Sequence, residues 1–135
     1  MKYNFYVPGP IVAKARPRVT MRGNKPRAYT PKKSADFEKV VAGACPIETP
    51  IDGPLDLKIN MYLLIPQSWS KTKTSEAAMG MIKPTTRPDL DNYLKSIMDG
   101  LNGVAYLDDS QIVSLSITKQ YARKEAGAFV FLETL

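Results

Sequence analysis

A strictly alternating segment near the middle of the chain constrains the fold more than any other feature. Residues 55–65 read LDLKINMYLLI: every second position from Leu55 to Leu63 is apolar, and the first three positions between them are acidic, basic and amide side chains. Successive side chains in a β-strand point to opposite faces, so this pattern predicts a strand with one buried and one polar face. Such a strand needs neighbours in a sheet and a layer that covers its apolar face.

Three other segments have the composition of strands. Residues 3–9, YNFYVPG, predict a first strand that ends at the proline and glycine. Residues 110–122 place Val113, Leu115 and Ile117 on one side, and residues 127–135 form the last apolar run. The intervening RKEAG predicts a hairpin that joins these two strands.

Two segments have helical periodicity. Residues 31–45 begin with a proline, and residues 89–101 end near Gly100 and Gly103. Each carries one apolar face, which we expect to pack on the sheet. These faces consist of Phe37, Val40, Val41 and Ala44 in the first helix, and of Leu90, Leu94, Ile97, Met98 and Leu101 in the second.

The order of these elements predicts the fold class. It reads β-loop-α-β-loop-α-β-β, without internal repeats, which indicates an α+β domain with a small mixed β-sheet and two main helices packed on one face. The length of 135 residues fits a single domain over residues 1–135.

Composition excludes several classes of protein and of chemistry. No apolar run approaches the ~18 residues that a membrane helix needs, and the first residues do not resemble a secretory signal, so we expect no membrane partner and a cytoplasmic location. Cys45 is the only cysteine, which excludes an internal disulfide and a multi-cysteine zinc site. Histidine is absent, so an enzyme of this sequence must use carboxylates, lysine, hydroxyl groups or a metal ion held by oxygen.

The formal net charge of +6 favours a polyanionic partner, and much of it lies in one segment. Residues 14–33 contain eight of the nineteen lysines and arginines and no acid. Three prolines and a glycine predict a loop or a ragged hairpin, suited to phosphate contacts along DNA. A solvated basic loop without a partner is the alternative. The candidate DNA-binding residues here are Lys14, Arg16, Arg18, Arg22, Lys25, Arg27, Lys32 and Lys33.

Residues 66–88 form a long polar connection with a helical turn expected around residues 75–79. Connections of this length in small domains are usually functional or mobile. Its basic side chains, Arg87 together with Lys71, Lys73 and Lys83, are candidates for a second DNA-contacting lid. Trp69 either stacks on a base or anchors the segment to the core, and we favour the anchor.

Acidic residues gather in the second helix and shortly after it. Asp89 and Asp91 lie in the first turn, where capping, the helix dipole and an ion pair from Asp91 to Lys95 would give them an ordinary structural role. Asp108 and Asp109 directly precede a strand, and we expect the short return to bring them back toward the start of the helix. Two converging acid clusters repel each other unless a cation lies between them. Mg²⁺, which binds carboxylate, water and phosphate oxygens, would serve phosphodiester hydrolysis there.

The sequence around these acids resembles that of a known family. Residues 83–113, KPTTRPDLDNYLKSIMDGLNGVAYLDDSQIV, are similar to the signature of the RusA family of Holliday-junction resolvases: an Asp-x-Asp-Asn, a lysine a turn later and an Asp-Asp-x-Gln-Val. The segments VPGPIVAKARPRV, YTPKK and IPQSWSK also resemble the phage and prophage branch of that family, so a bacterial host cell and a phage or prophage origin are expected.

This resemblance implies an activity and a set of site residues. Members are homodimeric, Mg²⁺-dependent endonucleases that cut four-way DNA junctions symmetrically, with a RusA-like fold. The resemblance places the catalytic acids at Asp89, Asp91 and Asp109, which would also hold the metal, and the catalytic lysine at Lys95. It offers Asp108 as an auxiliary ligand.

Other positions in the motif have weaker assignments. Asn92 and Gln111 are candidates to orient ligands or touch DNA, whereas Asp99 is expected to be structural because it lies at the far end of the helix. Family members with a short loop before the Asp-x-Asp lack the segment 66–88. Forks and other branched DNA therefore stay as alternative substrates, and a non-catalytic basic module or a regulator without turnover are alternative functions.

Overall fold

The computed structural model describes residues 1–15 and 18–135, with the side chain of Arg18 outside that description. Its elements, in chain order, are β1 (Lys2–Pro8), β2 (Arg18–Arg22), β3 (Lys25–Tyr29), α1 (Lys32–Ala44), β4 (Leu55–Leu64), α2 (Lys71–Ala78), α3 (Leu90–Leu101), the 3₁₀ turn η1 (Asp109–Gln111), β5 (Ile112–Ala122) and β6 (Gly127–Thr134).

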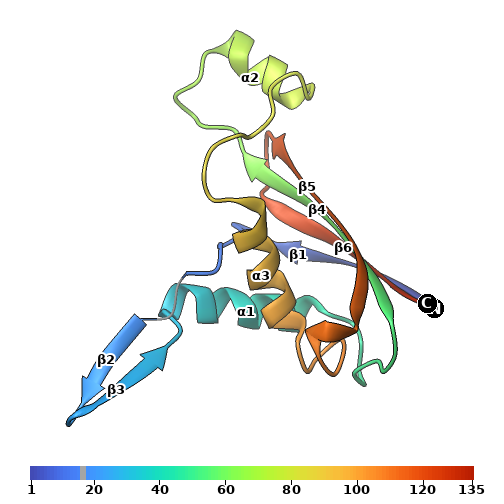
Figure 1. The fold of residues 1–135 in the computed structure, drawn as a ribbon. Helices are drawn as coiled ribbons and strands as arrows, with labels where there is room; N and C mark the ends of the chain where they lie inside the picture. The colour runs from blue at the N-terminus through green and yellow to red at the C-terminus, as the bar shows by residue number, and fades with distance from the viewer. Residues whose placement is uncertain (16–17) are drawn as a thin grey trace.

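Four strands form one mixed sheet in the order β1-β6-β4-β5 (Figure 1). β6 runs antiparallel to both β1 and β4, and β5 runs parallel to β4. In the register of the sheet, Ile59 of β4 lies between Val130 of β6 and Ile117 of β5. The predicted α+β class, with helices on one face of a small mixed sheet, is confirmed.

The connection between β5 and β6 differs from the prediction. We expected residues 123–127 to close a hairpin, but β4 lies between the two strands, so they do not pair. β5 is reached from β4 by a long crossover through α2 and α3, and it lies on one edge of β4 as a parallel strand. The chain then passes the end of β4 and returns along the other edge as β6.

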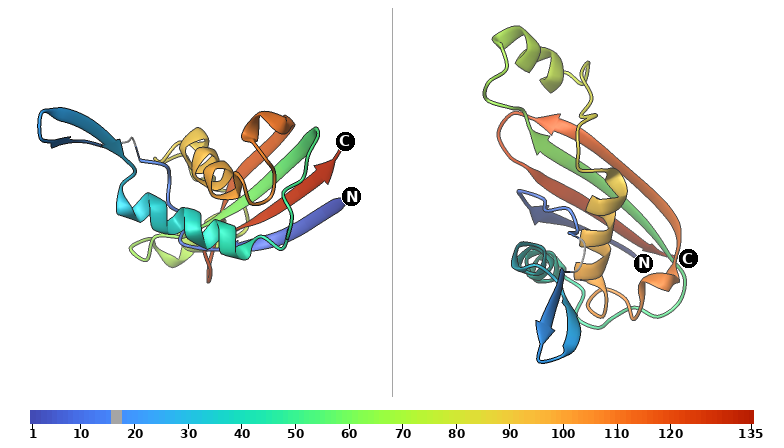
Figure 2. Two further views of the ribbon diagram at one scale, coloured as in Figure 1. Left: turned by 90° about the horizontal axis from the view of Figure 1, so that it is seen from below. Right: turned by 60° about the vertical axis from the view of Figure 1, so that its left-hand side comes forward.

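The core lies between this sheet and two helices. Alternate residues of β4, namely Leu55, Leu57, Ile59 and Met61, are fully buried, as the period-two pattern requires. Figure 2 shows α1 and α3 on the same face of the sheet. Val41 of α1 and Ile97 of α3 are fully buried in that layer.

Small side chains determine how α3 packs. Its buried residues are Tyr93, Ser96, Ile97, Gly100 and Leu101. By contrast, Leu90, Leu94 and Met98 of the predicted face are only half buried. The predicted residues pack in or against the core, and the buried face extends beyond them to Tyr93, Ser96 and Gly100. Gly100 allows the backbone of α3 to approach α1 closely, because a Cβ built on it would lie 2.7 Å from Cβ of Val41.

Two segments project from the body of the molecule (Figure 1). β2 and β3 pair with each other and form a separate two-stranded sheet, so the basic segment is a hairpin. α2 spans eight residues rather than the single turn we expected, and its N-cap Ser70 accepts a hydrogen bond from the backbone of Lys73. Trp69 packs edge-on against Tyr121 of β5, with ring centroids 5.3 Å apart, as expected of an anchor.

None of the helices in the described part of the chain has the length and apolar character that a membrane crossing requires.

Candidate active site

Two exposed carboxylates mark the start of α3. Asp89 occupies the N-cap position, yet its side chain makes no capping hydrogen bond, and Asp91 follows in the first turn. The expected ion pair from Asp91 to Lys95 is also not formed, because Lys95 pairs with Asp99 on the next turn. The helix dipole still favours acids at this position. In the described structure, Asp89 therefore does not cap the helix with its side chain, and Asp91 does not form an ion pair with Lys95.

A lysine on β5 fixes the turn that leads into α3. Lys119 Nζ donates hydrogen bonds to the carbonyl oxygens of Thr86 and Pro88, at 3.1 and 3.2 Å. Thr86 and Pro88 flank Arg87, and Pro88 directly precedes Asp89. This contact with β5 therefore positions the turn that carries Asp89. Sequence reasoning missed Lys119. The available signal was that it is the only charged residue in the segment Ile112–Ala122.

The second pair of acids lies on a rigid turn. Asp108 and Gln111 form a reciprocal capping box around η1: Asp108 Oδ2 accepts from the backbone of Ser110, and Gln111 Oε1 accepts from the backbone of Asp108. Gln111 Nε2 also donates to the carbonyls of Ile51 and Gly53. Hydrogen bonds from Ser110 hold the pKa of Asp108 below its ordinary value. Because its side chain bonds to the backbone of Asp108, Ile51 and Gly53, Gln111 fixes the position of the acid pair.

Lys95 lies between an acid further along α3 and one acid of the second pair. Its Nζ lies 2.9 Å from Oδ1 of Asp99 and 3.8 Å from Oδ2 of Asp109. The hydrogen bond with Asp99, and then the charge of Asp109, raise the pKa of Lys95, so this side chain is a cation at neutral pH. A protonated lysine stabilises negative charge and does not accept a proton.

Asp109 thus lies near Lys95 in the second turn of α3. The return through residues 102–107 is held to the C-terminal half of the helix by the fully buried Tyr106, whose hydroxyl donates to the carbonyl of Met98. Burial, and then the charges of Asp109 and Asp99, raise the pKa of Tyr106. No group of three acids among the described residues lies close enough together to hold a metal ion, so the convergence of Asp108 and Asp109 on the start of the helix stays a prediction.

The donor set nevertheless suits a hard divalent cation. Asp89, Asp91 and Asp109 offer carboxylate oxygens, and the first two are solvent-exposed. Mg²⁺ usually binds one or two carboxylates, keeps several water ligands and takes further oxygens from a substrate phosphate. An ion held by part of this set fits that chemistry without a closed protein cage.

The predicted DNA-binding residues fall into two groups. Most of them are exposed, either on the hairpin, at the start of α1 or just before α3: Arg22, Lys25, Arg27, Lys32, Lys33 and Arg87. Arg18 begins β2, and Arg16 lies outside the described residues. Lys14 differs, because its Nζ pairs with Glu38 at 2.6 Å and with Asp99 at 3.1 Å and its side chain is only 18% exposed.

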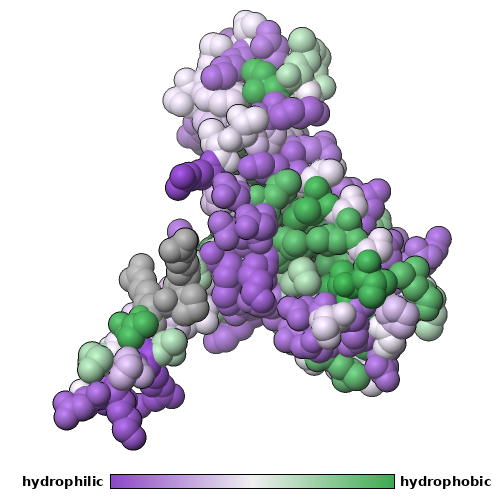
Figure 3. Space-filling model, viewed as in Figure 1, coloured by the Kyte–Doolittle hydropathy of each residue, from purple (hydrophilic) through white to green (hydrophobic). Residues whose placement is uncertain are grey.

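The surface around α3 is hydrophilic and flanked by the two projections. In the space-filling view, hydrophilic residues cover α3 and the tip of the hairpin (Figure 3). The hairpin lies on one side of this strip, and the α2 segment lies beyond the start of the helix (Figure 1). An extended polyanion lying along this face would meet the exposed acids of α3 between two basic segments.

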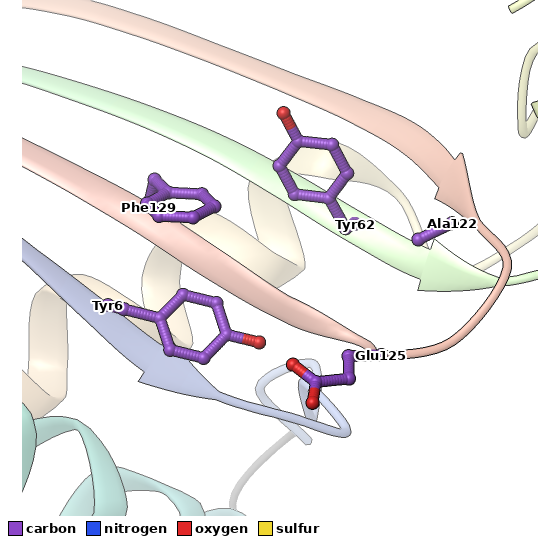
Figure 4. A pocket seen from close by; sticks show the side chains of 5 residues that line it. All are labelled: Tyr6, Tyr62, Ala122, Glu125 and Phe129. Carbon is purple, nitrogen blue, oxygen red and sulfur yellow. The ribbon is translucent and has the colours of Figure 1, made fainter.

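A hollow on the open face of the sheet has a different character. Tyr6, Tyr62, Ala122, Glu125 and Phe129 line it (Figure 4). The Phe129 ring lies 5.0 Å from the Tyr6 ring and 5.9 Å from the Tyr62 ring, measured between centroids. Without a basic side chain or a pair of acids in its lining, this hollow contributes nothing to the candidate active site.

Two comparisons place the chain among known proteins. The profile of a family described as endodeoxyribonuclease RusA matches residues 8–133, which include every site residue discussed above. The chain is also 40% identical, over 125 residues, to a Bacillus subtilis (strain 168) protein named "Uncharacterized protein YqaN"; the matched region covers 89% of this chain and 88% of that protein.

Proposed function

Because the chain belongs to the RusA family of endodeoxyribonucleases, we propose that it is a structure-selective, Mg²⁺-dependent endonuclease that resolves four-way DNA junctions by paired, symmetrical hydrolysis of phosphodiester bonds. The observation that carries this proposal is the exposed pair Asp89 and Asp91 at the start of α3, which forms neither the capping bond nor the ion pair expected of a structural role.

Each residue of the site has a role in this proposal. Asp89, Asp91 and Asp109 are the carboxylates from which a Mg²⁺ ion would take one or two ligands, with Asp108 as an auxiliary ligand, and water and the substrate phosphate would supply the rest. When bound, Mg²⁺ would make a coordinated water more acidic and would stabilise charge on the leaving oxygen. The Lys95 ammonium lies beside Asp109 and stabilises the negative charge that develops on the phosphate. The Lys119 ammonium positions the turn that carries Asp89.

The exposed basic residues supply DNA affinity. Arg22, Lys25 and Arg27 on the hairpin contact phosphates, and Lys32, Lys33 and Arg87 extend this surface toward α3. Phosphate contacts do not depend on the base sequence of the DNA. The selectivity for branched DNA therefore comes from the shape of the DNA that fits between the hairpin and the α2 segment.

A homodimer is part of the proposal, because symmetrical incision requires two sites related by a two-fold axis. The free edge of β5 supports this state: in the described structure β5 pairs with β4 alone, and Val113 and Leu115 are 65% and 45% exposed. Apolar side chains gather between α3 and this edge (Figure 3). An edge strand of this length, with Lys119 as its single charged residue, is a template for pairing with a second copy.

Location and origin follow from the proposed substrate. An enzyme that acts on intracellular DNA works in the bacterial cytoplasm, and we propose a phage or prophage origin from the motifs shared with that branch of the family.

The first test is cleavage of a labelled four-way junction, beside its linear duplex, with Mg²⁺ and with EDTA. We expect paired nicks on the junction only, and only with the metal. Asp91→Asn should bind the junction with the affinity of the original protein and cut at least about a thousandfold more slowly, because removal of a metal-binding charge costs several kcal/mol at the transition state. Asp36→Asn, an exposed acid on α1, is the matched control and should cut normally.

Other outcomes point to the alternatives. Undiminished cutting by Asp91→Asn would refute the assigned site. Faster cutting of a fork than of a junction would identify a nuclease for other branched DNA. Binding without cutting under both conditions would identify a non-catalytic module.

A further inference from the structure

Lys14 differs in its surroundings from the other basic residues of its segment whose side chains the structure describes, which are all exposed. Its side chain is 18% exposed and lies between α1 and α3, where Nζ contacts Glu38 Oε1 at 2.6 Å and Asp99 Oδ2 at 3.1 Å. Lys25 and Arg27, on the hairpin, are exposed. A lysine whose ammonium already bridges two carboxylates has little capacity left for a DNA phosphate.

The backbone at Lys14 is fixed to the same two helices. Its N–H donates to the carbonyl of Asn92 in α3, at 2.9 Å, and the next N–H, that of Ala15, donates to Ser34 Oγ in α1, at 3.2 Å. Ser34 is buried, so this attachment lies at the edge of the core. Side chain and backbone together hold residue 14 in one position.

Asp99 is shared between two lysines, which links Lys14 to the candidate active site. One carboxylate oxygen, Oδ2, contacts Lys14, and the other, Oδ1, contacts Lys95 at 2.9 Å. Lys95 in turn lies 3.8 Å from Asp109. The chain of charges therefore runs Glu38, Lys14, Asp99, Lys95, Asp109, with opposite signs at every step.

Removal of Lys14 would change what Lys95 experiences. The Asp99 carboxylate would lose its second partner and become free to turn both oxygens toward Lys95, which would strengthen that pair and withdraw the ammonium from Asp109. Glu38 would also be left without its lysine, near the charge of Asp99. The Lys14–Asp99 pair, whose side chains are 18% and 21% exposed, is screened less than a surface pair, and its loss reaches Lys95 through the shared Asp99 carboxylate.

We propose that Lys14 is a positioning residue that holds Asp99, and through it sets the place of the Lys95 ammonium at the active site, and that it does not contact DNA. This proposal rests on the proposed endonuclease function for its catalytic consequence. Its structural part, the coupling of Lys14 to Lys95, is measurable in the free protein.

The test compares Lys14→Met with two controls. Lys25→Met removes an exposed hairpin lysine, and Glu38→Gln removes the shorter ion pair of Lys14 while leaving Asp99 and Lys95 in contact. Junction binding is measured in EDTA over a range of salt, and single-turnover cleavage is measured at saturating junction with Mg²⁺. The signal of the Lys95 side-chain ammonium is followed by NMR in the free protein.

We expect Lys14→Met to keep the slope of log K for junction binding against log salt that the original protein shows. Lys25→Met should reduce the magnitude of this slope by about 0.9, the value for one phosphate contact. Lys14→Met should slow single-turnover cleavage about tenfold, with no further loss when combined with Asp99→Asn, and should shift the Lys95 signal. Glu38→Gln should cut at close to the original rate, although it loses a comparable ion pair.

Four results would overturn the proposal: a lower salt slope for Lys14→Met, an unchanged cleavage rate, an equal loss of rate in Glu38→Gln, or an unmoved Lys95 signal. If Lys14→Met does not fold, Lys14→Gln, which keeps a polar side chain, takes its place. Absence of cleavage by the original protein would instead refute the proposed function, and the binding slope and the NMR signal would still decide the role of Lys14.

Discussion

At the scale of single residues, the contact between Gly100 and Val41 determines how closely α3 approaches α1. A Cβ at position 100 would lie 2.7 Å from Cβ of Val41 and 3.0 Å from the carbonyl oxygen of Glu38. Neither atom is the end of a flexible side chain, so the helices would have to separate. The position therefore excludes every side chain larger than hydrogen without a shift of the backbone.

We therefore expect Gly100→Ala to lower the free energy of unfolding by about 1–3 kcal/mol, the usual cost of overpacking a core. Gly43 is the matched control, because it also lies in a helix, α1, and a Cβ there would meet nothing within 4 Å. Gly43→Ala should stabilise the protein by about 0.5–1 kcal/mol through its helix propensity. Urea denaturation measures both; equal effects of the two substitutions would contradict the close approach.

The sequence indicates which residues carry charge but not which charges meet. The Asp-x-Asp at the start of α3 is visible as a motif, and the family profile matches the region that contains it. Lys14 is indistinguishable in sequence from the other basic residues of its segment, because its partners Glu38 and Asp99 are 24 and 85 positions away and come near it only through the fold. Lys119 escaped prediction for the same reason.

At the scale of elements, the hairpin of β2 and β3 is separable from the rest of the structure. Its strands pair only with each other, and none of the hairpin side chains that the structure describes belongs to the buried core. Its four basic positions are Arg18, Arg22, Lys25 and Arg27. Changes in this hairpin should therefore alter DNA binding and leave the stability of the core nearly unchanged.

Replacement of residues 18–29 by a short glycine-serine linker should leave the far-ultraviolet circular dichroism of the core and its unfolding midpoint nearly unchanged. Junction affinity should fall, and the slope of log K against log salt should decrease in magnitude by about 2.7, since each of the three phosphate contacts proposed for Arg22, Lys25 and Arg27 contributes about 0.9. Fluorescence anisotropy with a labelled junction measures this. An unchanged slope would show that the hairpin does not contact DNA.

Elements with a strong local pattern were predictable, and pairings between elements were less so. The alternation in residues 55–65 identified β4, and the periodicity of residues 89–101 identified α3. All five apolar residues of the predicted α3 face belong to the core or pack against it. The extension of the buried face to Ser96 and Gly100 was missed, because a hydrophobic pattern does not include these small residues, whose size permits the contact with α1. The expected hairpin of β5 and β6 failed because no local signal reports that β4 lies between them.

At the scale of the whole molecule, the free edge of β5 is the surface at which we expect two copies to meet. Leu115→Arg places a charge on an exposed apolar position of this edge, and should raise the dissociation constant of the dimer about a hundredfold or more, which corresponds to ~3 kcal/mol. Val40→Arg is the matched control, because Val40 is exposed to a similar degree on α1. Sedimentation equilibrium measures both variants.

The interface is refuted if Leu115→Arg and Val40→Arg sediment alike as dimers. A monomeric mass for the original protein at working concentrations would refute the dimer itself. Circular dichroism confirms beforehand that Leu115→Arg retains its fold, since β5 also pairs with β4.

The strand order also governs how this protein is made on the ribosome. β6 lies between β1 and β4, yet it follows every other strand of the sheet in the chain. During synthesis β1 emerges first and has no neighbour until residues 127–134 leave the exit tunnel. Until then the nascent chain exposes one unpaired edge of β4 and both edges of β1, and unpaired strand edges are templates for aggregation. The protein therefore completes its sheet in a single late step, after nearly all of the described chain has been translated.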